Sequence, residues 1–140
     1  MRSVRLMDSD SLLASWDQTK QMLKSALSYS WQHGDTMFDV VERLADGRAD
    51  IVEVRQDGEL LAVAVVETFD RKDGEWLNVW ALAGDSMGDW IAELDAWLVD
   101  TARMRGLRGV MCGGRPGWEK TLARLGWSKR SVIMERSLCH

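Results

Sequence analysis

The residue types that most often carry chemistry are scarce in this 140-residue chain, which has two cysteines and two histidines. Cys112 precedes a pair of glycines, a position where nucleophiles occur, but a reactive thiolate needs a nearby base or positive surroundings. His33 follows a long helical pattern and His140 is the last residue, so neither is placed to activate it. We therefore interpret Cys112 as a small core residue. The same residues lack metal-ligand spacing, and no metal site is expected.

A glycine-rich loop, Gly113-Gly114-Arg115-Pro116-Gly117, is the second candidate for chemistry. Such loops cradle phosphates when a lysine-serine ending or the dinucleotide-binding spacing accompanies the glycines. Neither is present here. We interpret the loop as a tight connection between a strand and a helix, with Pro116 near the start of the helix. Arg115 remains a candidate surface contact.

The elements that position these residues follow from hydrophobic periodicity. Alternation predicts a short strand over Ser3–Met7, and apolar residues at helical spacing predict one helix over about residues 10–30. Asp35 or Thr36 is placed to cap a second helix. That helix is expected to end near Gly47.

The middle of the chain changes to the period of a β-sheet. Strands are expected at Ile51–Val54, Leu60–Phe69 and Trp76–Leu82, with turn signals between them at Gln56-Asp57-Gly58-Glu59 and Arg71-Lys72-Asp73-Gly74. Three such strands joined by short turns predict an antiparallel meander. The continuous apolar content of Leu60–Phe69 predicts a central strand that is covered on both faces.

The last third of the chain returns to helices alternating with strands. Asp85 or Ser86 is expected to open a long helix, whose apolar stripe ends before Gly106. The elements expected after it are a strand over Leu107–Cys112, a helix over Trp118–Leu125 and a final strand over Trp127–Leu138. The order β-α-α-β-β-β-α-β-α-β predicts one α/β domain over residues 1–140.

This order is similar to the GNAT acyltransferase fold, a mixed and largely antiparallel central sheet flanked by helices. The segment Gly117-Trp118-Glu119-Lys120-Thr121-Leu122-Ala123-Arg124-Leu125-Gly126-Trp127 resembles that family's closing helix and its leucine-glycine-aromatic turn. As topology, the resemblance covers nearly the whole chain. It implies binding of acetyl-CoA or another acyl-CoA where the family's site residues are kept.

A narrower resemblance comes from Gly114-Arg115-Pro116-Gly117-Trp118, from Leu125-Gly126-Trp127 and from Met134-Glu135-Arg136. This combination resembles small GNAT-like proteins of tailed bacteriophages, encoded among head and tail genes. Some of them are internal virion or assembly proteins rather than enzymes. The resemblance implies other phage structural proteins as partners, and a location in the virion or in the host cytoplasm during assembly.

The GNAT family holds the coenzyme pyrophosphate on a glycine-rich turn at a helix N-terminus, led by an Arg or Gln. The corresponding turn here offers Gly84, Ser86 and Gly88 as coenzyme-binding candidates, but it has no basic residue. Asp85 and Asp89 stand where the phosphates would dock, and each is expected to repel them by about 1 kcal/mol. We interpret these acidic residues as ordinary N-caps.

Acyl transfer to an amine also needs groups that move protons. The tyrosine that often serves as the acid in the GNAT family corresponds to Leu122, which has no proton to donate. The one tyrosine of the chain, Tyr29, belongs to the first helical pattern. Glu67 and Glu75, on the central strands, are the candidates for a general base.

Charge and tryptophan content point to interaction surfaces. Residues 1–100 hold 9 Lys and Arg against 20 Asp and Glu, a charge of −11, whereas residues 101–140 hold 9 against 2, a charge of +7. The acidic majority disfavours nucleic acid, and docking to proteins or to further copies of the chain is the better explanation. With eight tryptophans in the chain, the candidates for such an interface are Arg115, Trp118, Arg124, Trp127 and Arg130.

The missing basic loop and the missing acid together favour a non-catalytic GNAT-fold phage protein that acts in virion structure or in head and tail assembly, and for this role no cofactor is expected. The alternative is an acyl-CoA-dependent N-acyltransferase with a degenerate coenzyme loop and Glu67 or Glu75 as its base. No apolar run has the roughly 20 residues that a membrane span needs, so no membrane span is expected.

Overall fold

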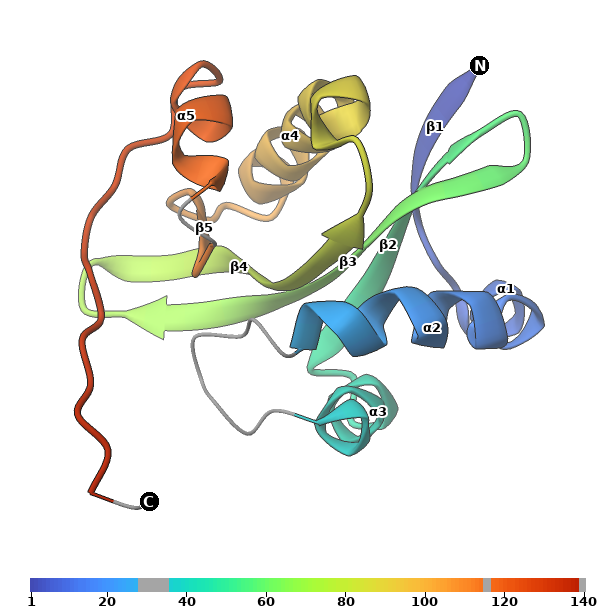
Figure 1. Cartoon of the computed structure of the whole chain (residues 1–140), viewed down its shortest axis with the longest axis horizontal. Coiled ribbons are helices and arrows are strands. Elements are labelled where there is room, and N and C mark those ends of the chain that lie inside the picture. Colours follow the sequence, from blue (N-terminus) through green and yellow to red (C-terminus); the bar gives the residue numbers. More distant parts are fainter. Residues whose placement is uncertain (28–35, 115–116, 139–140) are drawn as a thin grey trace.

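The computed structural model describes residues 1–27, 36–114 and 117–138, and within them the chain forms one five-stranded sheet (Figure 1). The strands are β1 (Arg2–Leu6), β2 (Ala49–Gln56), β3 (Glu59–Arg71), β4 (Gly74–Gly84) and β5 (Val110–Cys112). They lie in the order β1-β2-β3-β4-β5, antiparallel except for the parallel pair of β4 and β5. The expected mixed, largely antiparallel sheet is confirmed.

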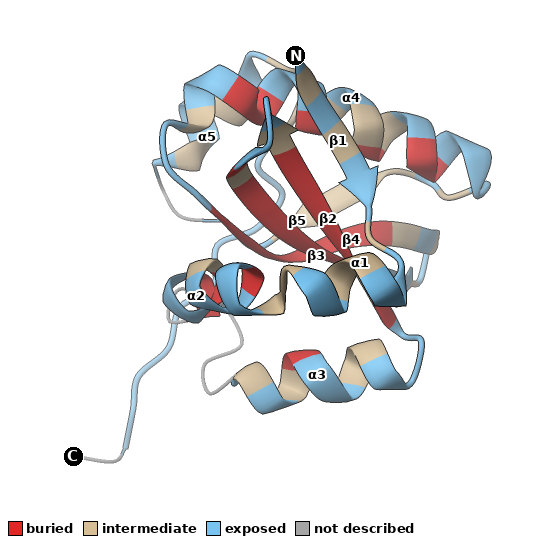
Figure 2. Ribbon diagram, turned by 90° about the vertical axis from the view of Figure 1, so that its right-hand side faces the viewer, coloured by how far each residue is buried: buried red, intermediate tan, exposed pale blue. Residues whose placement is uncertain are grey.

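Helices cover both faces of this sheet, as Figures 1 and 2 show. The helices are α1 (Ser9–Ala14), α2 (Trp16–Leu27), α3 (Met37–Ala45), α4 (Met87–Met104) and α5 (Trp118–Ala123). α1 to α3 lie on one face, and α4 and α5 lie on the other. No helix in the described ranges is long and apolar enough to cross a membrane.

Two hydrophobic cores form, one on each face of the sheet. Val63 and Val65 point toward α2 and α3, whereas Ala64 and Val66 point toward α4, because successive side chains of a strand alternate between faces. β3 is therefore buried on both faces and lies in the middle of the sheet, as the continuous apolar run predicted.

Turn and cap residues hold the elements as expected at several positions. Asp57 (φ +51°) and Gly58 (φ +86°) form the two-residue turn between β2 and β3, with the two positive φ angles that favour an Asp-Gly sequence. Thr36 caps α3 through a reciprocal pair of hydrogen bonds with Asp39. Asp8 caps α1 by accepting from the Ser11 amide, and this bond lowers the pKa of the Asp8 carboxyl.

The single helix expected over residues 10–30 is wrong, because α1 and α2 are separated at Ser15. The Ser15 hydroxyl donates to the Glu53 carboxylate on β2 at 3.1 Å, and the backbone oxygen of Ser11, at 3.2 Å, is the alternative acceptor for the same proton. Glu53 is almost completely buried and is also paired with Arg55. A buried charge needs such partners, and the helix break lets Ser15 supply one of them. Residues 28–30 of the expected helix lie outside the described residues.

The final strand expected over Trp127–Leu138 is also wrong, because this stretch forms no strand and residues 128–138 are exposed. Gly126 (φ +98°) turns the chain as it leaves α5, and the Trp127 amide then donates to Leu122. The strand expected over Leu107–Cys112 is limited to the three residues of β5. The observed order is β-α-α-α-β-β-β-α-β-α.

Candidate functional site

A cluster of polar side chains surrounds Glu67 where β3 and β4 face α3. Glu67 on β3 is the register partner of Asn78 on β4, and the Asn78 amide nitrogen donates to Glu67 Oε1 at 3.1 Å. From α3, Arg43 Nη1 donates to Glu67 Oε2 at 2.9 Å. Both oxygens of this largely buried carboxylate are therefore held by donors from two different elements. Such bonds fix the carboxylate in one orientation.

Trp80 completes the cluster from a β-bulge in β4. Val65 pairs with Ala81 while Val66 pairs with Val79, so Trp80 is the extra residue of β4 between the two pairs. A bulge redirects the side chain it carries, and here the guanidinium carbon of Arg43 lies 4.0 Å from the Trp80 ring centroid. The ring supports the guanidinium that binds Glu67.

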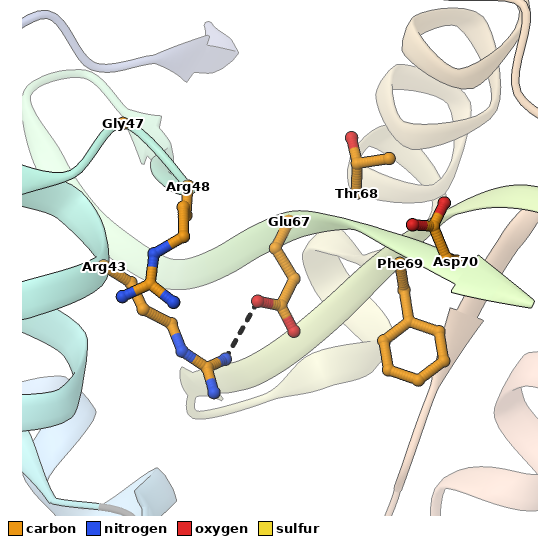
Figure 3. Close-up of a pocket in the computed structure, with 7 residues that line it drawn as sticks. All are labelled: Arg43, Gly47, Arg48, Glu67, Thr68, Phe69 and Asp70. Carbon is orange, nitrogen blue, oxygen red and sulfur yellow. Dashed lines mark hydrogen bonds and ion pairs between the residues drawn. The ribbon is translucent and has the colours of Figure 1, made fainter.

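A cleft opens beside Glu67 on this face of the sheet (Figure 3). It has a volume of about 480 Å³ and is lined by Arg43, Gly47, Arg48, Glu67, Thr68, Phe69 and Asp70. The buried Asn78 Oδ1 has no hydrogen-bond partner within the described part of the chain. A buried polar atom without a partner is uncommon. The cluster thus offers a carboxylate next to solvent-accessible space, which suits binding a cation or accepting a proton.

The two predicted candidates for a general base, Glu67 and Glu75, lie on opposite faces of the sheet. Glu75 is exposed and pairs with Asp70, three positions along the β3–β4 ladder from the pair of Glu67 and Asn78. Because side chains alternate along a strand, an odd offset puts Glu75 and Glu67 on opposite faces. The structure brings Glu67 into the cluster and leaves Glu75 outside it.

The turn that leads from β4 into α4 has an unusual backbone. Gly84 has a φ of +150°, and Ser86 opens α4 in the left-handed conformation (φ +55°, ψ +50°) without a side-chain cap. Ser86 is the N-cap residue, as one of the two expected alternatives, whereas the interpretation of Asp85 and Asp89 as N-caps is wrong, because Asp85 precedes the cap and Asp89 lies within the first turn of α4. The Trp90 indole stabilises the turn by donating a hydrogen bond to the backbone oxygen of Asp85 at 2.7 Å.

The backbone and the side chains of this turn have opposite effects on an anion. A helix N-terminus attracts anions through its first amides and its dipole, and no side chain caps the first turn of α4. Asp85 and Asp89 are both exposed beside those amides. Coenzyme binding by Gly84, Ser86 and Gly88 therefore stays a prediction, and the flanking carboxylates would weaken the binding of a phosphate group there.

The residues near the end of β5 do not form a nucleophilic site. Burial raises the pKa of the Cys112 thiol to about 11, so the thiol stays protonated near neutral pH. Leu122 packs against the core between α4 and the sheet. His33 and His140 lie outside the described residues, and the described residues contain no group of three or more His, Cys, Asp or Glu side chains that could hold a metal ion.

The five interface candidates lie in different environments. Trp118 packs against the core and lies over Gly114, where an added Cβ would come within 2.7 Å of the ring. The Trp127 indole donates to Asp95 Oδ1 on α4 at 2.7 Å. Arg124 and Arg130 are exposed. Arg115 lies outside the described residues, and the interface role of all five stays a prediction.

Sequence reasoning missed Arg43, Asn78 and Trp80 as members of the cluster. One signal for Asn78 was available, because a two-residue turn over Lys72 and Asp73 fixes the register of β3 and β4. That register places Asn78 directly opposite Glu67. Arg43 comes from α3, and no sequence pattern showed which helix covers this part of the sheet.

Comparison with known proteins identifies the fold. No protein-family model and no curated protein matches the sequence. Among solved structures, the chain is similar to a predicted acetyltransferase with acetyl-CoA from Clostridium acetobutylicum (TM-score 0.67, 16% identity, covering 99% of this chain and 97% of that one). It is also similar to AAC(6')-Iy in complex with the bisubstrate analogue CoA-S-monomethyl-acetylneamine (TM-score 0.68, 17% identity, 99% of both chains).

A third similar structure is the ribosomal-protein-alanine N-acetyltransferase from Brucella melitensis (TM-score 0.63, 18% identity, covering 96% of this chain and 100% of that one). The chain therefore has the fold of the GNAT acetyltransferases. At these identities the similarity establishes the fold, and the activity has to be argued from the site. None of these comparisons concerns a phage particle, so the narrower resemblance to phage proteins stays a prediction.

Proposed function

We propose that this chain is an N-acyltransferase that transfers an acyl group from an acyl-CoA thioester to an amine. The observation that carries the proposal is the Glu67 carboxylate, held by Arg43 and Asn78 beside an open cleft. This arrangement stands on a sheet with the fold of acetyltransferases, two of which were solved with acetyl-CoA or a CoA bisubstrate analogue.

Glu67 is assigned the role of general base. An amine near neutral pH is mostly protonated and becomes a nucleophile only after it loses a proton. An ionised carboxylate has about four acceptor positions, and Arg43 and Asn78 use one on each oxygen of Glu67. The remaining lone pairs are available to a substrate ammonium in the cleft. Arg43 and Asn78 are positioning residues, because they act through Glu67.

The transfer itself follows from the released amine. The amine nitrogen attacks the thioester carbonyl carbon, a C–N bond forms, and the C–S bond breaks to release the coenzyme thiolate. With Leu122 in place of an acidic side chain, the thiolate takes its proton from water. The phosphates of the coenzyme are assigned to the first amides of α4 near Ser86, where Asp85 and Asp89 make the affinity low.

The assay for this proposal measures thiol release from acetyl-CoA with a panel of primary amines. We expect amine-dependent release by the wild-type chain and a fall in kcat of about 100-fold or more for Glu67→Gln, within the usual range for loss of a general base. Glu75→Gln is the matched variant, since Glu75 is exposed on the opposite face. A Glu67→Gln variant with an unchanged kcat would refute the proposal, and so would the absence of amine-dependent thiol release by the wild-type chain.

A second candidate function is the non-catalytic role in phage structure or assembly, with other phage structural proteins as partners. It is favoured by the acidic residues Asp85 and Asp89 at the coenzyme turn and by Leu122 in the closing helix. Titration with acetyl-CoA separates the two candidates, because this role predicts no binding even at millimolar ligand. Co-purification with phage particles or assembly intermediates is then the positive test.

A further inference from the structure

The two arginines that line the cleft beside Glu67 come from the same end of α3. Arg43 lies in the last turn of this helix, and Arg48 lies two residues after its C-cap. The Arg48 amide donates to the backbone oxygen of Arg43 at 2.9 Å. The Gly47 amide donates to the backbone oxygen of Leu44 at 3.2 Å. With Gly47 at a φ of +71°, these two bonds form a Schellman motif, which fixes the backbone from which Arg48 extends.

The charges on this side of β3 do not balance. In Figure 3, Glu67 and Phe69 point from β3 toward the side where the two arginines lie, whereas Asp70 points to the other side of the strand. One carboxylate of the cleft lining therefore faces two guanidinium groups, those of Arg43 and Arg48. Glu67 is already paired with Arg43 at 2.9 Å. The cleft thus carries one positive charge in excess, on Arg48.

The Arg48 guanidinium has donors to offer a ligand. It forms ion pairs with Asp46 at 2.9 Å and with Glu42 at 3.6 Å, and both pairs use Nη2. Within the described ranges, Nε and Nη1 of Arg48 donate to no other group. All three side chains are more than half exposed, and ion pairs between exposed side chains contribute little to stability. A carboxylate in the cleft can therefore replace these pairs.

An ammonium group bound to Glu67 adds a further positive charge to the cleft. It would lie next to the guanidinium of Arg43, which already neutralises Glu67, and in the same cleft as Arg48. Like charges at short range repel, and the repulsion is stronger where side chains are partly buried. An amine that also carries a carboxylate is neutral overall. Its carboxylate suits the planar donors of a guanidinium group, so Arg48 favours this class of amine.

We propose that the acceptor substrate is a small amine that also carries a carboxylate, such as an amino acid, and that Arg48 selects it. This inference rests on the proposed function, because Glu67 holds the ammonium group of the same molecule. Phe69 is half-buried on the same side of β3 and offers an apolar surface to the carbon chain. The cleft volume of about 480 Å³ lies within the usual range of about 300–1,000 Å³ for small-molecule sites.

The first test compares amines that differ only in a carboxylate, using thiol release from acetyl-CoA. Glycine, β-alanine, γ-aminobutyrate and δ-aminovalerate are each assayed beside the decarboxylated amine: methylamine, ethylamine, propylamine and butylamine. The series varies the separation between ammonium and carboxylate. We expect at least one amino acid to exceed its paired amine in kcat/KM by about tenfold or more. If the amines react and no amino acid is preferred, the inference is wrong while the proposed function stands.

Variants of Arg48 distinguish selection from a structural role. Arg48→Gln should raise KM for the preferred amino acid about tenfold, with kcat and the paired amine little changed, whereas Arg48→Lys should retain part of the preference. Arg103→Gln is the matched control, because Arg103 is also exposed near the end of a helix but lies on α4, across the sheet. It should leave the preference unchanged. An Arg48→Gln variant that loses activity equally with both members of each pair would overturn the inference.

The second test measures binding without turnover. Ligand-observed NMR gives the Kd of each amino acid and of its paired amine, with coenzyme A in place of acetyl-CoA. We expect the preferred amino acid to bind about tenfold more tightly than its paired amine, and Arg48→Gln to remove the difference. Binding that depends on Arg48 without any thiol release would support the carboxylate site and refute the proposed function. Equal Kd values, or no binding of either compound, would overturn the inference.

Discussion

Replacing Gly84 by alanine is expected to destabilise the chain, whereas the same change at Gly88 is not. A Cβ at Gly84 would lie 2.6 Å from the backbone oxygen of Leu61, 2.9 Å from the Ala62 Cβ and 3.0 Å from the Trp90 ring. Its φ of +150° is also one that side chains rarely adopt. Backbone strain and overpacking each cost about 1–3 kcal/mol, so we expect Gly84→Ala to lower the free energy of unfolding by about 3 kcal/mol.

Gly88 is the matched control for this prediction. It lies in the first turn of α4, and a Cβ there would meet nothing within 4 Å. Gly88→Ala should therefore leave stability unchanged or raise it by about 0.5 kcal/mol, because alanine favours a helix. Urea unfolding followed by tryptophan fluorescence measures both variants, and the midpoint of Gly84→Ala should fall by about 2 M. Equal midpoints for the two variants would refute the packing argument and leave phosphate binding as the reason for both glycines.

Three further predictions concern charge, burial and a buried hydrogen bond. Asp85→Asn and Asp89→Asn should each tighten acetyl-CoA binding about fivefold in calorimetry, because each removes about 1 kcal/mol of repulsion; unchanged affinity contradicts this. Burial raises the pKa of Cys112 from 9.0 to about 11, so the folded chain binds more protons than the unfolded chain in this range. The free energy of unfolding, measured with urea, should therefore fall from pH 9 to pH 11. In Cys112→Ala the free energy of unfolding should fall less over the same pH range, because the thiol is absent. Ser15→Ala should lower stability by about 1–2 kcal/mol in the same assay through the lost bond to Glu53, whereas a change below 0.5 kcal/mol contradicts that role.

The sheet was predictable from sequence because its signals are local. The Asp57-Gly58 turn and the long apolar run after it fix a hairpin and a central strand without information from elsewhere in the chain. The break between α1 and α2 was not predictable, because it depends on Glu53, a residue 38 positions from Ser15 that β2 carries into the interior. Hydrophobic periodicity depends on neighbouring residues alone, so it cannot indicate a partner that is distant in the sequence.

The candidate site was predictable in part for the same reason. Glu67 stood out as an acidic residue in an apolar strand, and the β3–β4 register would have added Asn78. Arg43 required knowledge of which helix packs over that pair. The prediction of a strand over Trp127–Leu138 was wrong for a different reason, because the sequence has a strand pattern while the structure places this stretch away from the sheet. Strand propensity indicates only that a segment favours the extended conformation. To join a sheet, the segment also needs an edge strand with which it can pair.

The unequal lengths of the strand pairs also set an order of opening for the sheet. β5 is held to β4 by three register pairs and β1 to β2 by five, whereas β3 is paired along most of its length on both sides. Antiparallel hairpins between neighbouring strands form quickly, but β1 and β5 join the sheet only after long stretches of chain have closed. Amide hydrogen exchange should therefore proceed inward from the two outer strands, and the amides of β3 should exchange last, at the free energy of global unfolding.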